Sequence, residues 1–245
     1  FMKITSFLYA ILFLFIFQIN HAQSIVSDPE INKMVAEVSA TNMENSVRKL
    51  VSFGTRHTLS DTKSNSRGIG AAQRWVKSEF DNYAKASNGR LTSEIDYFTI
   101  KADGRRIKND SQLGNVMATL KGTDATDDRV LIISGHLDSR ATDVMDSIID
   151  APGANDDGSG VAAMMELAKI MCKREFPFTI IFVAVVGEEQ GLYGAKHLAD
   201  KAKDQNWNVI AMINNDMIGN SLSSGTQLRD NTQVRVFSET IPYLE

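Results

Sequence analysis

The sequence VLIISGHLDSRATDVMDSIIDAPGANDDGSG, residues 130–160, decides the fold. It opens with an apolar run, which predicts a buried strand, and the polar sequence GHLDSR follows directly. Because side chains alternate across a strand, His136 and Asp138 leave the end of this strand on the same side. The acidic, glycine-rich end of the stretch, APGANDDGSG, precedes an amphipathic helix and can bring Asp156 back to that strand end. The stretch therefore predicts one place where an imidazole and carboxylates meet.

The rest of the chain alternates between strand and helix patterns. A helical region at 28–53 contains Thr41 and Glu44 at the spacing of a capping box. The order of elements predicts an α/β fold, a three-layer αβα sandwich with a mostly parallel central sheet. Further helices are predicted at 67–86, directly after residue 160 and at 191–203, and strands at 91–100, 115–120, 130–134, 178–186 and 209–213.

Acidic side chains follow two more of the predicted strands. Glu188 and Glu189 come after a near-continuous apolar run, which is typical of a central strand covered on both faces. Asp216 follows the next strand along the chain. In sheets of this type ligands bind at the carboxyl ends of the strands, so we expect these side chains to join His136.

Composition is that of an ordinary globular protein. The 245 residues are enough for one domain and a little more, and the hydrophobic fraction of 43% supplies a core. A formal net charge of −4 gives no basic surface for nucleic acid, so no nucleic-acid partner is expected. The single cysteine excludes an intramolecular disulfide. Nothing in the sequence indicates an oligomeric state.

The amino-terminal segment has the pattern of a secretory signal. Met2 and Lys3 precede a short apolar run at 7–19, and a small residue follows within a polar end. We expect residues 1–22 to be a signal peptide and residues 23–245 to form the mature domain, secreted or periplasmic and without stable membrane association. A retained anchor is the alternative, but the apolar run is short for a membrane span.

Imidazole and carboxylate ligands suit zinc, and one carboxylate can bridge two ions. Singly, each acidic group has a simpler explanation. The Glu188-Glu189 pair could begin a solvated helix, the Asp156-Asp157 pair could cap the helix that follows, and Asp216 could end a strand in a turn. Together, at successive strand ends, these carboxylates would repel one another without a cation, which favours a metal-dependent enzyme.

Four motifs in this order resemble the co-catalytic di-zinc exopeptidases of metallopeptidase family 28, which include secreted bacterial aminopeptidases. With their connecting strands they cover most of the chain beyond residue 110. The motifs are GHLDS at 135–139, PGANDDGSG at 152–160, EEQGLYG at 188–194 and NDM at 215–217.

The resemblance implies a set of metal ligands. His136 and Asp216 would bind one zinc ion, and Asp156 would bridge the two ions. Glu189 would bind the second ion. The resemblance also implies a cis peptide bond after the bridging residue, between Asp156 and Asp157.

Two further roles follow from the resemblance. Glu188 matches the general base, which takes a proton from a metal-activated water and returns it to the leaving group. Asp138 matches the carboxylate that fixes the ring of His136.

One part of the family pattern is absent. The family has another His ligand for the second ion, well beyond the position of Asp216, but no His follows His197 in this sequence. His197 lies within a predicted helix and is a poor substitute, and His57, in a polar loop, is expected to be structural or merely exposed. We interpret residues 23–245 as a zinc peptidase domain that is incomplete at its carboxyl end. A fragment without this His ligand can be inactive.

The sequence thus predicts a secreted zinc exopeptidase acting on peptides. The leading hypothesis is an aminopeptidase that hydrolyses the amino-terminal peptide bond. Alternatives are a carboxypeptidase or a glutaminyl cyclase on the same fold, or a non-catalytic binding homologue. All the acidic site residues are present, which argues against a non-catalytic binding homologue.

Overall fold

The computed structural model describes residues 28–222 and residue 236. The predicted signal peptide at 1–22 lies outside the described residues. The chain divides into two compact units, Phe1–Ala36 and Glu37–Glu245. In the first unit the described residues form most of helix α2 (Pro29–Glu37). The second unit contains the sheet and the remaining helices, and the following paragraphs concern this unit alone.

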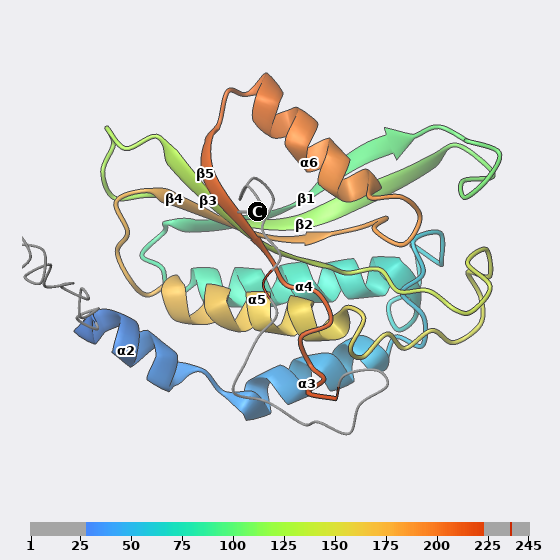
Figure 1. The fold of residues 1–245 in the computed structure, drawn as a ribbon, viewed down its shortest axis with the longest axis horizontal. Coiled ribbons are helices and arrows are strands. Elements are labelled where there is room, and N and C mark those ends of the chain that lie inside the picture. Colours follow the sequence, from blue (N-terminus) through green and yellow to red (C-terminus); the bar gives the residue numbers. More distant parts are fainter. Residues whose placement is uncertain (1–27, 223–235, 237–245) are drawn as a thin grey trace, which may run out of the picture. The chain divides into compact units, whose positions relative to one another are not determined.

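The centre of the second unit is a five-stranded sheet with the order β1-β2-β4-β3-β5 (Figure 1). The strands β3, β4 and β5 run parallel to one another, whereas β2 is antiparallel to both of its neighbours. The strands are β1 (Leu91–Ile100), β2 (Ser111–Leu120), β3 (Arg129–His136), β4 (Thr179–Val185) and β5 (Asn208–Asn214).

The sheet is therefore mixed, and the prediction of a mostly parallel sheet was only partly correct. The reason lies in the connection between β1 and β2. Residues 101–110 join these strands directly, and a connection this short joins antiparallel neighbours, because a parallel pair needs a longer crossover. The parallel part of the sheet is the part that carries the predicted site.

Helices cover both faces of the sheet, as the three-layer prediction required. Helices α4 (Gly68–Ala84) and α5 (Gly158–Met171) cover one face, with α3 (Ala40–Val51) packed against α5, and α6 (Tyr193–Asp204) covers the other face (Figure 1). Two hydrophobic cores lie on the two faces of the sheet, and alternate residues of β4 pack into one or the other. Phe182 belongs to the larger core beneath α4 and α5, and Val183 packs in the smaller core with Leu198 of α6.

The predicted capping box at Thr41 and Glu44 was wrong. Helix α3 begins at Ala40, and Ser39 is its cap: the Ser39 side chain accepts a hydrogen bond from the backbone N–H of Asn42 at 3.2 Å. Ser39 has extended backbone angles, which the cap position requires. Glu44 pairs instead with Arg48 one turn along the helix.

The parallel strands bring three chain segments together at their carboxyl ends. His136 is the last residue of β3, Glu188 and Glu189 follow β4, and Asp216 follows β5. The strand β5 lies at the edge of the sheet, and its side chains are exposed in the described structure. Among the described residues, no helix is long and apolar enough to cross a membrane.

Candidate metal centre

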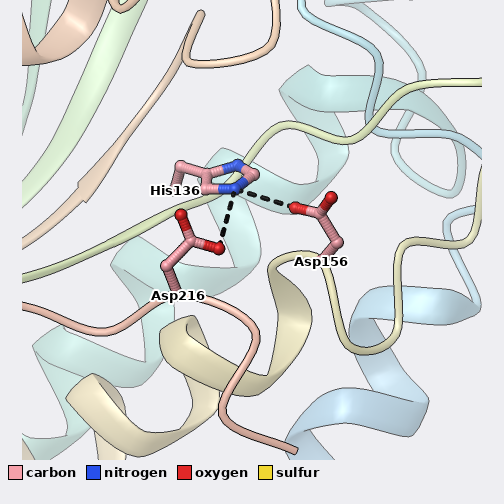
Figure 2. A group of neighbouring side chains, drawn as sticks. All are labelled: His136, Asp156 and Asp216. Carbon is pink, nitrogen blue, oxygen red and sulfur yellow. Dashed lines mark ion pairs between the residues drawn. The ribbon is translucent and has the colours of Figure 1, made fainter. Parts of the chain in front are cut away.

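His136, Asp156 and Asp216 form a compact cluster at the carboxyl ends of the parallel strands (Figure 2). One potential ligand atom from each residue lies within 4.8 Å of the others. The Nε2 atom of His136 is 3.0 Å from Oδ1 of Asp156 and 3.9 Å from Oδ1 of Asp216. His136 is buried, whereas the two carboxylates are exposed, so the cluster opens towards solvent on its acidic side.

The ring of His136 has one nitrogen engaged and one available. Its Nδ1 atom lies 3.0 Å from the backbone carbonyl oxygen of Asp138, so Nδ1–H donates to this carbonyl and Nε2 faces the carboxylates. Burial alone would lower the pKa of His136. The carboxylates of Asp138, Asp157 and Glu188 outweigh burial and raise this pKa to about 10. The surroundings therefore stabilise positive charge at the ring, and an imidazole with two carboxylates is a donor set that zinc accepts.

Asp138 holds the loop that follows β4. Its buried carboxylate accepts hydrogen bonds from the hydroxyl of Thr58 at 2.6 Å and from the backbone N–H groups of Glu188 and Glu189, each at 3.2 Å. The carboxylate oxygen nearest to His136 is 3.7 Å from Nδ1. Asp138 thus contacts the ring most closely through its backbone carbonyl, and its predicted role in fixing the ring stays a prediction.

Asp157 is a structural element of the site that the sequence indicated only as a possible helix cap. Its buried carboxylate caps α5 by accepting from the backbone N–H of Gly160 at 3.0 Å. It also accepts from the backbone N–H of His136 at 2.9 Å and of Met217 at 3.2 Å. Burial raises the pKa of Asp157 to about 7. The Asp156–Asp157 peptide bond is cis, as the resemblance implied.

Glu188 lies beside the cluster without belonging to it. Its Oε2 atom is 3.9 Å from Nε2 of His136, and about a third of its side chain, 32%, is exposed. Burial raises its pKa; the charge of His136 opposes this, and the carboxylates of Asp138, Asp216 and Asp156 add to it. A carboxylate with a raised pKa at the solvent side of a metal cluster can exchange protons with water.

The structure does not bring Glu189 into the three-residue cluster. Its Oε2 atom lies 3.5 Å from Nε of Arg140, and its backbone carbonyl accepts from Arg106 at 2.8 Å. Burial, followed by the charges of Asp156 and Asp138, raises the pKa of Glu189 to about 7. Its predicted role as ligand of a second ion stays a prediction.

The other two histidines of the described chain lie elsewhere. His57 is buried, with Nε2 3.0 Å from the carbonyl oxygen of Val144 and Nδ1 accepting from the backbone N–H of Leu59. His197 contacts Asp96 at 3.1 Å and stacks on Phe98. Neither belongs to the cluster, as the sequence had suggested.

The fold and the cluster define an α/β protein with a candidate metal centre at the carboxyl ends of parallel strands. Residues 115–238, about half of the chain, match Peptidase family M28, and the chain belongs to this family. The family expected from the motifs is thereby confirmed.

Named relatives agree with this assignment. A probable zinc metalloprotease of Leptosphaeria maculans is 47% identical over 218 residues, which cover 89% of this chain and 50% of the relative. The chain spans about half the length of the curated relatives it matches.

Solved structures share the fold. The Legionella pneumophila LapA aminopeptidase aligns with a TM-score of 0.60 and 25% identity, covering 78% of this chain and 46% of LapA. A glutaminyl cyclase of an Acidobacteriales bacterium aligns with a TM-score of 0.57 and 22% identity, covering 74% of this chain and 59% of the cyclase. The secreted bacterial aminopeptidase type and the pair of zinc ions stay predictions.

Proposed function

We propose that this chain carries the zinc centre of a secreted exopeptidase, an aminopeptidase that hydrolyses the amino-terminal bond of peptides. The convergence of His136 Nε2 with the carboxylates of Asp156 and Asp216, beside Glu188, is the observation that carries the proposal. The name of the LapA structure supports the choice of an aminopeptidase.

His136, Asp156 and Asp216 would hold the ion. Zinc, when bound, polarises a carbonyl group and lowers the pKa of water. A second ion at Glu189, with Asp156 as the bridge, belongs to the same proposal. It requires a further ligand, because the described residues form one candidate cluster and Glu189 lies outside it.

Glu188 would move the proton. Its carboxylate, with a pKa raised mainly by burial, takes a proton from the attacking water and delivers it to the departing amine. The hydrogen bond from its backbone N–H to Asp138 keeps the residue at the edge of the cluster.

The charge around the cluster favours an amino end over a carboxyl end of a peptide. Glu188 is partly exposed there and is not one of the proposed ligands, and a free α-ammonium group is attracted to such a carboxylate. A substrate carboxylate would instead have to recruit Arg140, which pairs with Glu189.

The test combines zinc content with hydrolysis of amino-acid anilides by the protein and its Glu188→Gln variant. We expect the protein to bind zinc and cleave anilides, and the variant to keep zinc and lose cleavage. Glu44→Gln, a change in a surface ion pair of α3, is the control and should leave both measurements unchanged.

Other outcomes would identify the alternatives. Cleavage of amino-blocked peptides from their carboxyl end would identify a carboxypeptidase, and cyclisation of amino-terminal glutamine would identify a glutaminyl cyclase. Zinc binding without any of these reactions would favour a binding homologue and overturn the proposal.

A further inference from the structure

Arg56 is fully buried and holds backbone carbonyl groups with its guanidinium group. Nε donates to the carbonyl of Leu137 at 2.8 Å, and Nη2 donates to that of Gly153 at 2.9 Å. Nη1 donates to the carbonyls of Pro152 at 2.6 Å and Leu50 at 3.3 Å. One planar group thus satisfies four carbonyls, three of them in irregular backbone and one, that of Leu50, in the last turn of α3.

Three of these carbonyls lie in the two loops that supply the cluster. Leu137 stands between His136 and Asp138, directly after β3. Pro152 and Gly153 begin the loop that ends in Asp156. The guanidinium group therefore ties the segment that carries the imidazole ligand to the segment that carries a carboxylate ligand.

Two further contacts strengthen this connection. The hydroxyl of Ser139 donates to the carbonyl of Ala151 at 2.7 Å and accepts from the backbone N–H of Arg56 at 3.1 Å. The carbonyl of Gly153 also accepts from the backbone N–H of Gly158 at 3.0 Å, just beyond Asp156. The loop from 151 to 158 is held at both its beginning and its end.

Burial of a guanidinium group is costly unless its donors are satisfied. None of the ion pairs found among the described residues includes Arg56, so its burial depends on the carbonyls. Burial lowers the pKa of Arg56 to about 10, and the carboxylates of Asp138, Asp157 and Asp156 oppose the decrease. Arg56 is thus charged at neutral pH, and its charge offsets part of the repulsion between these carboxylates.

We propose that Arg56 is a positioning residue of the metal centre, which sets the separation between the ligand atoms of His136 and Asp156 and thereby the affinity for zinc. It acts through the two loops and touches neither substrate nor metal. The inference rests on the proposed function, because it takes these two residues as zinc ligands.

The critical variant is Arg56→Lys, which keeps the positive charge. A lysine carries its donors on one nitrogen and cannot reach carbonyls on different sides as the planar guanidinium group does. The control is Arg90→Lys. Arg90 also donates to two carbonyls, of Cys172 at 3.3 Å and Arg174 at 2.6 Å, but at the carboxyl end of α5, away from the cluster.

The experiment measures zinc affinity of each protein by competition with a chromophoric chelator, together with thermal unfolding of the metal-free protein. We expect Arg56→Lys to weaken zinc binding about 10–100-fold, the range for residues that orient ligands. Arg90→Lys should change zinc affinity less than twofold even if it lowers the unfolding temperature. In a zinc-loaded assay, Arg56→Lys should lower kcat with little change in KM.

A second variant keeps the proposal testable if Arg56→Lys does not fold. Ser139→Ala removes one hydrogen bond between the same two loops and should weaken zinc binding in the same direction by a smaller factor. Wild-type zinc affinity in a folded Arg56→Lys protein would show that Arg56 is merely structural and overturn the inference alone. If the wild-type protein binds no zinc, this inference and the proposed function both fail.

Discussion

Oδ1 of Asp138 accepts a hydrogen bond from the backbone N–H of Glu188, with 3.2 Å between the two heavy atoms. Asp138 follows β3 and Glu188 follows β4, so this bond joins the ends of two neighbouring parallel strands. The same carboxylate is buried and also holds Thr58 and Glu189. The place of the proposed base therefore depends on a carboxylate that solvent does not reach.

Replacement of the Asp138 carboxylate should displace Glu188, the proposed general base. In Asp138→Asn an amide N–H₂ replaces one oxygen and faces a backbone N–H donor, either that of Glu188 or that of Glu189. We expect kcat/KM to fall about 10–100-fold and the free energy of unfolding to fall by about 1–3 kcal/mol. Anilide hydrolysis and urea unfolding are the measurements.

The control for this change is Thr58→Val, which removes one of the three donors to Asp138 and keeps the carboxylate. It should have the smaller effect on both quantities. Equal activity in Asp138→Asn and the wild-type protein would contradict the arrangement described for Asp138.

The different surroundings of His136 and His197 give a second prediction. His136→Ala removes the imidazole from the cluster, whereas His197→Ala removes one that pairs with Asp96 outside it. Zinc affinity should fall more than about 100-fold for His136→Ala, beyond the range for residues that only orient ligands. It should stay at the wild-type value for His197→Ala. Zinc titration decides, and a similar loss in both variants would argue against the cluster as the site.

Much of the sheet could be predicted because its signals are local. Strand β1 has the bounds that its alternating pattern predicted, and β3, β4 and β5 differ from prediction by one or two residues. Strand β2 begins earlier than expected, at Ser111. Its first residues have little apolar pattern, and their pairing with β1, from Ile100 opposite Ser111 onwards, sets the length of the strand.

The meeting of three of the proposed ligands could be predicted for a similar reason, whereas the residues that hold them could not. His136, Asp156 and Asp216 each follow a recognisable strand or precede a helix. Arg56 and Thr58 lie in a loop whose polar sequence suggests exposure to solvent, but both residues are buried in the structure. Polar side chains become buried where irregular backbone needs partners, and which backbone segment comes close is a property of the whole fold.

A third prediction concerns the close approach of α5 to the segment after β5. A Cβ atom on Gly160 would collide with the backbone carbonyl of Asn215 and with the carboxylate of Asp157. Gly160→Ala should lower the free energy of unfolding by about 1–3 kcal/mol. It should also weaken zinc binding, because Asn215 precedes the proposed ligand Asp216.

Gly104→Ala provides the comparison for this glycine. A Cβ atom there meets nothing within 4 Å, but the backbone has a φ of +68°, so the cost is strain alone, about 1–2 kcal/mol. Stability should fall while zinc affinity stays unchanged. Urea unfolding and zinc titration separate the two cases, and unchanged zinc affinity in Gly160→Ala would refute the link to Asp216.

The last prediction uses the turn between β1 and β2. Asp103 accepts hydrogen bonds from the backbone N–H groups of Arg105, Arg106 and Ile107 at 2.8, 2.9 and 2.8 Å, and from the hydroxyl of Tyr193 at 2.9 Å. The bonds from Ile107 and Arg105 are the main reason that its pKa is lowered from 3.8 to about 2. The carboxylate therefore holds the hairpin together and connects it to the start of α6.

A lowered pKa in the folded state means that the unfolded chain binds the proton more readily. The stabilisation by the Asp103 carboxylate is therefore complete above about pH 4 to 5 and is lost as pH falls from 3.8 towards 2. Asp103→Asn, which lacks the charge at every pH, should be less stable than the wild-type protein at pH 7, and the difference should shrink towards pH 2. Urea unfolding of the metal-free proteins across this range is the measurement. Tyr193→Phe, which removes one donor to the same carboxylate, should show a smaller difference with the same pH dependence. A difference that stays constant from pH 7 to pH 2 would mean that the charge of Asp103 does not stabilise the turn.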